Sequence, residues 1–434
     1  MQVLKRRLEK SEEYWERAKK VIPAGTQTLS KGPTQYVQGV APKYLKSGKG
    51  SHVFDVDGNE YIDYAMALHP VILGYSYPRV NEAIRRQLED GTTFSLMHPL
   101  EVEVSEMLVD TVPCAEMVRF GKSGSDATTA AVRVARAFTG RDKIASEGYH
   151  GWHDWYIGTT EHSKGVPQAV KALTETFRYN DIESLRQVFA KNKGEIAAVI
   201  MEPVGIVEPE PGFLQEVKDL SHKNGALLIF DEVISGFRMS LGGAQEFFGV
   251  TPDLAAFGKA MANGMPISAL VGRTDVMSQL NEVFFSHTFG GETLSLAASL
   301  ATVSELREKK VIPYLWRQGK KLQEAYQKIA EEAHLESGYT ISCIGYPPRN
   351  VIAFRDVTGK DCLEMKSLFQ QEMIKRGILF PGYNAISFSH SDEDIEKTIE
   401  AYVDSMKIVA KAAKENNFRK YLEGGVVSPV FRNP

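Results

Sequence analysis

The sequence predicts an α/β protein with a mainly parallel central sheet covered by helices on both faces, together with a smaller α+β part. The first observation is a series of short apolar runs between residues 75 and 300, such as "MVRF", "IAAVIM" and "ALLIF". Runs without polar alternation are typical of strands buried on both faces. The second is that helix-like stretches such as "GFLQEVKDLSHKNG" separate these runs, as expected for successive βα units. The third is a change of pattern after about residue 305.

The first 74 residues combine a helix with a β-hairpin. Apolar and charged residues have helical spacing over residues 4–21, and a Pro-Ala-Gly turn follows, so we expect an amphipathic helix that ends there. Two strand-like runs flank Asp57-Gly58 in "HVFDVDGNEYIDYA", and an Asp-Gly pair between such runs is a strong hairpin signal. We expect residues 1–74 to pack on the small domain.

The rest of the chain is expected to form a large and a small domain. Residues 75–305 carry the buried strands and their helices and would form the large domain. Residues 306–434 contain a long helical stretch, "PYLWRQGKKLQEAYQKIAEEA", then the strand-like "NVIAFRD", another helix and "GILF". This pattern indicates a smaller α+β domain.

Composition limits the possible functions. The chain has 434 residues, of which 43% are apolar and 24% charged, as is ordinary for a globular protein. Its net charge of −4 argues against a nucleic-acid surface, and no apolar run approaches the ~18 residues needed to span a bilayer. The three cysteines have no CxxC spacing, and the charged first twenty residues do not resemble a signal peptide. We therefore expect a cytoplasmic protein in a reducing compartment.

A glycine-serine turn joins a strand to a helix in "MVRFGKSGSDATTAAVRVARAF". Backbone N–H groups and hydroxyls of Ser123, Gly124 and Ser125 can hold a phosphate at the N-terminus of the helix. An ordinary turn, capped by one of its own polar side chains, is the alternative. A nucleotide P-loop is excluded, because its first glycine is replaced by Glu116.

A carboxylate and an amine end two later strands of the same sheet. Asp231 closes "ALLIFD", and Lys259 stands alone among small, apolar and amide residues in "DLAAFGKAMANGMPISAL". Singly, the aspartate could cap a turn and the lysine could reach water. Together with the phosphate turn they match the needs of pyridoxal 5'-phosphate (PLP). The lysine bonds to its aldehyde and the carboxylate keeps its pyridine nitrogen protonated.

The segment "EGYHGWHDWY" offers an aromatic platform and two histidines. Tyr149 or Trp152 could stack on the cofactor ring. His150 and His153 could be metal ligands, but no third ligand lies at a recognisable spacing, so we predict a structural role for the pair and no metal site.

These motifs resemble those of the class III aminotransferases, which are fold-type I PLP enzymes, and most closely the glutamate-1-semialdehyde aminomutase branch. The resemblance extends over about residues 12–410 and is carried by "DVDGNEYIDY", "SGSDATTAAVRVARAFTGRDKI", "YHG", "EPV", "LLIFDEVISGFR" and "FGKAMANGMPISALVG". It implies a homodimer with shared active sites, in which the N-terminal segment also packs on the partner.

The resemblance also implies roles for individual residues. Lys259 would bond to the cofactor aldehyde and shuttle protons, and Asp231 would pair with the pyridinium nitrogen. The other cofactor-binding positions would be Ser123, Gly124 and Ser125 at the phosphate, Val233 under the ring, Tyr149 over it, His150 in the same set, and Thr288 reaching the phosphate from the other subunit.

The differences from the aminomutase pattern concern the substrate. Lys31 stands where the aminomutase has an arginine that clamps the substrate carboxylate, and an ammonium cannot make that planar, two-pronged contact. His69 ends "ALH" in place of Ser-Trp-Gly, and Asn384 replaces the carboxylate of "FEAG". We predict that Lys31, His69, Glu202 and Asn384 contact the substrate.

The sequence after "YHG" also lacks a match to the gating segment of the aminomutase, and retention of an intermediate requires such a lid. We therefore expect an aminotransferase that moves an amino group from a small-molecule donor to a carbonyl acceptor, with a sugar-like acceptor suggested by the polar replacements. The alternatives are the aminomutase, a PLP-dependent racemase or epimerase, and a non-catalytic scaffold. The last would not need Lys259, Asp231 and the phosphate turn together.

Overall fold

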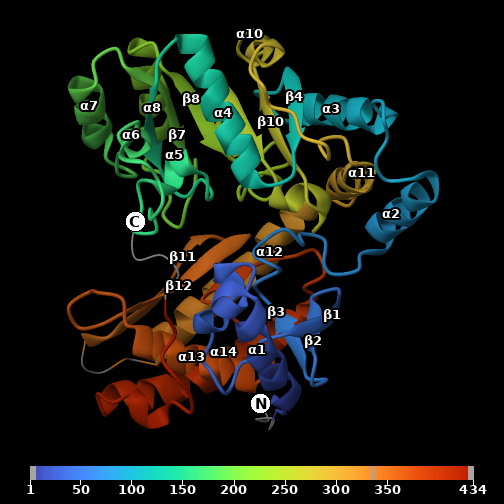
Figure 1. Cartoon of the computed structure of the whole chain (residues 1–434). Coiled ribbons are helices and arrows are strands. Elements are labelled where there is room, and N and C mark those ends of the chain that lie inside the picture. Colours follow the sequence, from blue (N-terminus) through green and yellow to red (C-terminus); the bar gives the residue numbers. More distant parts are fainter. Residues whose placement is uncertain (1–5, 334, 336–337, 429–434) are drawn as a thin grey trace. The chain divides into compact units, whose positions relative to one another are not determined.

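The structure is a computed structural model that describes residues 6–333, 335 and 338–428 (Figure 1). The chain forms two compact units. The large unit contains residues 69–71 and 78–312, and the small unit contains residues 1–68, 72–77 and 313–434. The N-terminal segment and the C-terminal part of the chain thus belong to the same unit.

The large unit is built on a seven-stranded sheet with the strand order β4-β10-β9-β8-β7-β5-β6. Strand β10 runs antiparallel to both of its neighbours, and the other pairings are parallel, which confirms the predicted mainly parallel sheet. The carboxyl ends of the six parallel strands therefore lie at one edge. The strands are β4 (Met117–Gly121), β5 (Lys143–Glu147), β6 (Thr174–Thr176), β7 (Ile196–Met201), β8 (Leu227–Asp231), β9 (Leu254–Phe257) and β10 (Ser268–Gly272).

Helices connect these strands, and Figure 1 shows α4 crossing one face of the sheet. Its inner face is made of small residues, among them Ala127, Ala131 and Ala135, each fully buried, which lets the helix backbone approach the strands closely. The helices are α2 (Pro78–Asp90), α3 (Pro99–Thr111), α4 (Gly124–Thr139), α5 (Asp154–Ile157), α6 (Gln168–Lys171), α7 (Ile182–Lys191), α8 (Phe213–Lys223), α9 (Ala244–Phe248), α10 (Thr274–Met277), α11 (Thr293–Glu308), and the 3-10 turns η4 (Lys259–Ala262) and η5 (Ser278–Asn281).

The small unit contains two short sheets, ordered β1-β2-β3-β13 and β11-β12-β14. The predicted hairpin is present as β2 and β3, which pair antiparallel around Gly58 (φ +91°). Strand β13 adds parallel to β3, so residues far apart in the chain share one sheet. The strands are β1 (Leu45–Lys49), β2 (His52–Asp55), β3 (Glu60–Asp63), β11 (Thr340–Tyr346), β12 (Arg349–Arg355), β13 (Ile378–Leu379) and β14 (Tyr383–Ala385).

The helices associated with the small unit are α1 (Glu9–Val21), α12 (Val311–Glu332), α13 (Leu363–Lys375), α14 (Asp392–Lys414), and the 3-10 turns η1 (Pro23–Gly25), η2 (Leu29–Lys31), η3 (Pro33–Gln35) and η7 (Arg419–Tyr421).

The first helix is shorter than predicted. The helix expected over residues 4–21 begins only at Glu9, and residues 4 and 5 lie outside the described ranges. A basic residue in the first turn would oppose the helix dipole, and the Arg6 guanidinium instead lies over the Tyr61 ring.

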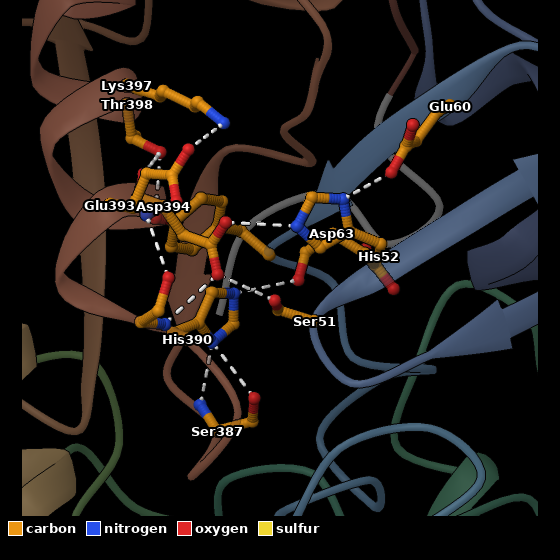
Figure 2. Close-up of polar contacts among 12 residues, drawn as sticks. Ser51, His52, Glu60, Asp63, Ser387, His390, Glu393, Asp394, Lys397 and Thr398 are labelled. Carbon is orange, nitrogen blue, oxygen red and sulfur yellow. Dashed lines mark hydrogen bonds and ion pairs between the residues drawn. The ribbon is translucent and has the colours of Figure 1, made fainter.

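A polar network joins strands β2 and β3 to the start of α14 (Figure 2). Ser391 and Asp394 form a capping box at the N-terminus of this helix. The Asp394 carboxylate also accepts a hydrogen bond from Ser51 Oγ (2.8 Å) and lies 3.0 Å from His52 Nε2.

In the parts of the chain that the structure describes, no helix combines the length and apolarity needed to cross a membrane.

Candidate active site

The predicted phosphate turn lies between β4 and α4. Ser123 caps the helix: its Oγ accepts a hydrogen bond from the Asp126 N–H (3.3 Å), and Asp126 Oδ2 accepts one from the Ser123 N–H (2.7 Å). The Ser123 hydroxyl and the Asp126 carboxylate therefore each accept a hydrogen bond from the backbone N–H of the other residue. The N–H groups of Gly124 and Ser125 begin the helix and have no acceptor within it. The turn presents these two donors to an outside anion.

Three loops of the large unit meet at Val233. A Cβ atom added at Gly124 would lie 2.8 Å from Val233 Cγ1, and one added at Gly258 would lie 3.6 Å from the same atom. The turn after β4, the turn after β8 and the residue before Lys259 are therefore in close proximity. Any side chain at Gly124 would fill the space between the phosphate turn and Val233.

Asp231 is the last residue of β8 and only 4% exposed. Its Oδ1 accepts a hydrogen bond from the Val233 N–H (3.0 Å), and its Oδ2 lies 2.8 Å from His150 Nδ1. Each carboxylate oxygen thus has one fixed partner. The buried carboxylate cannot rotate without losing both contacts.

The loop after β5 closes over these residues. The Tyr149 N–H donates to Glu202 Oε1 (3.0 Å), and Thr128 Oγ1 on α4 donates to the His150 carbonyl (2.9 Å). Gly151 packs so tightly on Ser125 Oγ that an added Cβ would collide with it. The Tyr149 side chain is 45% exposed, and burial, followed by the charges of Asp231 and Glu202, raises its pKa. Its ring therefore lies beside the Asp231 site.

Lys259 begins η4 directly after β9. Strand β9 pairs with β8, and Asp231 lies opposite Ala256 in that pairing, so the amine and the carboxylate leave the same sheet edge on adjacent strands. The Lys259 backbone has a φ of +41°, a conformation that is uncommon for a non-glycine residue and is found preferentially at functional sites. Its side chain is half-buried.

Glu147 is a site residue that the sequence analysis did not identify. It ends β5, and burial, together with the charge of Glu202, raises its pKa to about 7. The rule that ligands bind beyond the carboxyl ends of parallel strands would have pointed to it. Three neighbouring strands thus end in, or directly before, the carboxylates Glu147, Glu202 and Asp231.

The four predicted substrate residues are divided between the two units: Lys31 and Asn384 belong to the small unit, and His69 and Glu202 belong to the large unit. Lys31 is exposed on η2 of the small unit. His69 is 6% exposed in the large unit, where its carbonyl accepts from Arg238 Nη2 (3.0 Å). Glu202 is committed to the backbone of Tyr149. Thr288 is exposed in the large unit.

The Asn384 side chain lies in the core of the small unit. It is 1% exposed. Its Nδ2 donates to Asn350 Oδ1 (2.8 Å), and its Oδ1 accepts from the Tyr402 hydroxyl (3.1 Å). The nitrogen and the oxygen of the amide each have one partner within the core, and a contact of Asn384 with the substrate stays a prediction.

The two histidines of the HxxH pair have different environments. His153 Nδ1 lies 2.7 Å from Thr129 Oγ1, whereas His150 is paired with Asp231. Among the described residues, no group of three or more histidine, cysteine or acidic side chains could hold a metal ion.

The fold and this site define the protein as an enzyme of the PLP-dependent transaminase class. The aminotransferase class-III family matches residues 36–337, and the chain belongs to this family. It is 38% identical to the 3-aminobutyryl-CoA aminotransferase of Cloacimonas acidaminovorans, over 94% of this chain and 99% of that protein. It is 39% identical to a glutamate-1-semialdehyde 2,1-aminomutase of Alkaliphilus oremlandii, over 93% of this chain and 100% of that protein.

A solved structure supports the same assignment. The FumI protein of Sphingopyxis sp. MTA144, in its PLP internal aldimine form, superposes with a TM-score of 0.87 at 27% identity, covering 93% of this chain and 97% of that one. The cofactor of this enzyme family is PLP, and the residues of the large unit fit it. A helix N-terminus with two available N–H groups suits the phosphate, a buried carboxylate suits the ring nitrogen, and a lysine leaves the adjacent strand.

Proposed function

We propose that Lys259 and Asp231 are the catalytic residues of this aminotransferase, which moves an amino group from a small-molecule donor to a carbonyl acceptor. The observation that supports this most is the convergence of three loops at Val233. The phosphate turn, the end of β8 beside Asp231 and the residue before Lys259 all meet there. A protein that used this fold only as a scaffold would not need these groups at one sheet edge.

PLP, when bound, supplies an aldehyde that bonds to amines and a ring that accepts the electron pair left when a proton is removed. The Asp231 carboxylate holds a proton at the ring nitrogen. The Lys259 amine would hold the aldehyde end of the cofactor, and its Nζ would take up the substrate proton and return it. The N–H groups of Gly124 and Ser125, with the Ser123 and Ser125 hydroxyls, hold the phosphate.

Two side chains orient the ring in this proposal. Val233 lies beside the phosphate turn and would form the lower face of the ring site, and Tyr149 would stack above it. Glu202 acts on Tyr149 through its backbone, since Glu202 Oε1 accepts the Tyr149 N–H. This contact makes Glu202 a residue that positions the ring stack.

The reaction with the donor and the acceptor occurs in two separate half-reactions in our proposal. Lys31 and His69 would contact the acceptor, which we take to be a polar carbonyl compound.

The aminomutase reaction is the second candidate, because a relative with that name is 39% identical to this chain over 93% of its length. Incubation of the PLP-loaded enzyme with glutamate-1-semialdehyde separates the two: rapid formation of 5-aminolevulinate would establish the aminomutase and contradict our proposal.

The direct test replaces the amine. We expect Lys259→Ala to lose catalysis by on the order of 10³-fold or more, the scale seen when a group that acts chemically in the reaction is removed. The measurement is keto-acid release from candidate amino donors, followed together with the visible absorbance of bound PLP. Lys143→Ala is the matched control, because Lys143 begins β5 at the opposite sheet edge and is ion-paired with Glu195. Activity of Lys259→Ala close to that of the control would overturn the proposal.

We also propose that the enzyme is a homodimer in which Thr288 completes the phosphate site of the partner. Large apolar side chains are exposed on two loops of the large unit: Phe94, Leu96 and Met97 on one, and Phe284 and Phe289, which flank Thr288, on the other. Exposed apolar groups of this kind are typical of protein–protein interfaces. Sedimentation of wild-type protein and of Phe284→Glu tests this, with monomeric wild-type protein as the contrary result.

A cytoplasmic location is part of the same proposal. It is supported by Cys114, Cys343 and Cys362, which are all free thiols, as expected in a reducing compartment.

A further inference from the structure

We propose that His150 is a positioning residue that remains a doubly protonated imidazolium and holds the Asp231 carboxylate ionised in one orientation. This inference rests on the proposed role of Asp231 at the ring nitrogen. His150 itself is assigned no contact with the substrate.

The partners of the two ring nitrogens determine the protonation of His150. Nε2 lies 2.6 Å from the Glu147 backbone carbonyl, which can only accept, so Nε2 carries a proton. Nδ1 lies 2.8 Å from Asp231 Oδ2. One proton must lie between these two atoms, and it belongs on the imidazole, because a histidine is more basic than an aspartate by roughly 2.6 pKa units in water. His150 is therefore the cation of a buried ion pair.

Both charges of the pair have further partners. The Val233 N–H donates to the other Asp231 oxygen, and the Glu147 carbonyl accepts from the far side of the imidazolium. A buried ion pair requires such additional hydrogen bonds to compensate for its lost hydration. The pKa of His150 agrees with this geometry. Burial opposes its protonation, but the hydrogen bond and charge of Asp231 outweigh burial and raise the pKa.

The surrounding helices prevent the imidazole from turning. The indole ring of Trp155 stacks on it at a centroid distance of 6.0 Å and an angle of 14°, and Tyr156 meets it edge-on at 5.3 Å. Thr128 on α4 fixes the His150 carbonyl (2.9 Å). The side chain is 2% exposed. Its two N–H vectors are therefore fixed by packing, and the Asp231 carboxylate is oriented by a rigid donor.

The charge of His150 matters because several acidic groups on different elements lie near it. They are Asp231 on β8, Glu147 on β5, Glu202 after β7, Tyr149 in the loop, and Tyr156 on α5. Without the imidazolium, burial and these neighbours would favour a protonated Asp231. A protonated Asp231 could not hold a proton at the ring nitrogen, so the catalytic rate would fall although the lysine and the phosphate turn are intact.

The first test measures the protonation of His150 in the wild-type protein and needs no variant. We expect ¹⁵N NMR of the cofactor-free protein to show His150 with both ring nitrogens protonated at about pH 8, well above the ordinary histidine pKa of about 6.5. Resonances are assigned by their loss in His150→Asn. A neutral imidazole with a single N–H at that pH would overturn the proposal.

The second test separates positioning from packing. His150→Asn keeps a donor in place of Nδ1 but removes the charge, and we expect kcat to fall by about 10- to 100-fold, as is usual when a supporting hydrogen-bond partner of a reacting group is lost. The KM for the amino donor should stay within about threefold, because no substrate contact is removed. The pH profile of kcat should also change, since the positive charge that faces the Asp231 carboxylate is then absent. His153→Asn is the matched control, since His153 bonds to a threonine hydroxyl.

A double-mutant cycle makes the outcome decisive. In an Asp231→Asn background, His150→Asn should add less than about threefold, because the two residues act as one unit. Full additivity of the two losses, or wild-type kcat and pH profile in His150→Asn, would overturn the proposal. Activity remaining in Lys259→Ala would contradict the proposed function but would leave the NMR result for His150 unchanged, so the two failures are distinguishable.

Discussion

Two buried histidines, one in each unit, show how a single hydrogen-bond partner decides a charge. His150 in the large unit and His390 in the small unit are 2% and 0% exposed, and each points Nε2 at a backbone carbonyl. They differ at Nδ1. His150 Nδ1 faces the Asp231 carboxylate, whereas His390 Nδ1 accepts a hydrogen bond from the Ser387 N–H (3.0 Å; Figure 2).

The consequence is opposite protonation of two similar side chains. Burial lowers the pKa of His390 to about 4, so it is neutral at physiological pH and packs against Tyr64 with a ring distance of 4.5 Å. At His150 the carboxylate outweighs the same burial. Burial alone therefore removes the charge of a histidine, and one carboxylate on the second nitrogen restores it.

The largest expected effect comes from removing the carboxylate that distinguishes the two histidines. In Asp231→Asn, His150 should become neutral like His390, and kcat should fall by about 10³-fold, near the upper end of losses seen when a preorganised electrostatic partner is removed. The measurements are donor half-reaction kinetics and ¹⁵N NMR of the imidazole.

Asp253→Asn is the control for this substitution, because Asp253 is also a buried carboxylate paired with a histidine, His222 (2.8 Å). The folded control should keep its activity. An imidazolium that persists at His150 after Asp231→Asn would show that the carboxylate is not the cause of the difference.

A smaller effect is expected from His390, whose protonation should lower the free energy of unfolding at acidic pH. Its pKa is about 4 when folded and about 6.5 when unfolded, so between these values the unfolded chain binds more protons. The free energy of unfolding should therefore fall as the pH drops from about 6.5 to about 4, by up to about 3 kcal/mol from this group. Urea unfolding of wild-type protein and His390→Gln across this range measures the difference. The exposed His162→Gln should leave the pH dependence unchanged, and an equal slope in His390→Gln would contradict the assignment.

The smallest effect concerns His52, which belongs to the same polar network (Figure 2). Its contribution to the pH dependence of stability has the opposite sign to that of His390. Its nitrogens lie 2.8 Å from Glu60 Oε1 and 3.0 Å from Asp394 Oδ1, and the hydrogen bond to Asp394 is the main cause of its raised pKa. This stabilisation is complete below the unfolded pKa of about 6.5 and is lost as the pH rises through the folded pKa.

The expected size is about 1 kcal/mol or less, because His52 is partly exposed and Lys397 and Lys49 lie on the adjoining α14 and β1. His52→Gln should be less stable than wild type in urea at about pH 6 and equal to it at about pH 9. A deficit of the same size at both pH values would show that the loss is one of packing.

Local patterns were sufficient to predict strands β4, β7 and β8 and the position of Asp231 at the end of β8. The unbroken apolar runs identified the parallel sheet, and its topology then places Asp231 and Lys259 at one edge. Their roles in catalysis remain predictions. The start of α1 was misjudged because apolar periodicity continues into a segment whose Arg6 is held by Tyr61, more than fifty residues away.

Contacts across the fold explain the remaining differences. The Asn384 amide forms hydrogen bonds with Asn350 and Tyr402 in the core, and neither partner can be read from its position in the sequence. Glu147 was missed because a carboxylate at a strand end carries no sequence sign of its neighbours, and its raised pKa comes from burial and from Glu202, which directly follows the adjacent strand β7.

The sequence by itself determined which residue types end the strands of a mainly parallel sheet, because apolar periodicity and turn residues act over a few neighbouring positions. Only the tertiary structure decided how those residues are charged. "YHGWHD" and "SHSDED" both place a histidine among polar neighbours, yet one histidine meets a carboxylate 81 positions away and the other a backbone N–H three positions away. A protonation state depends on burial and on the nearest charge in space, and neither quantity is local in the chain.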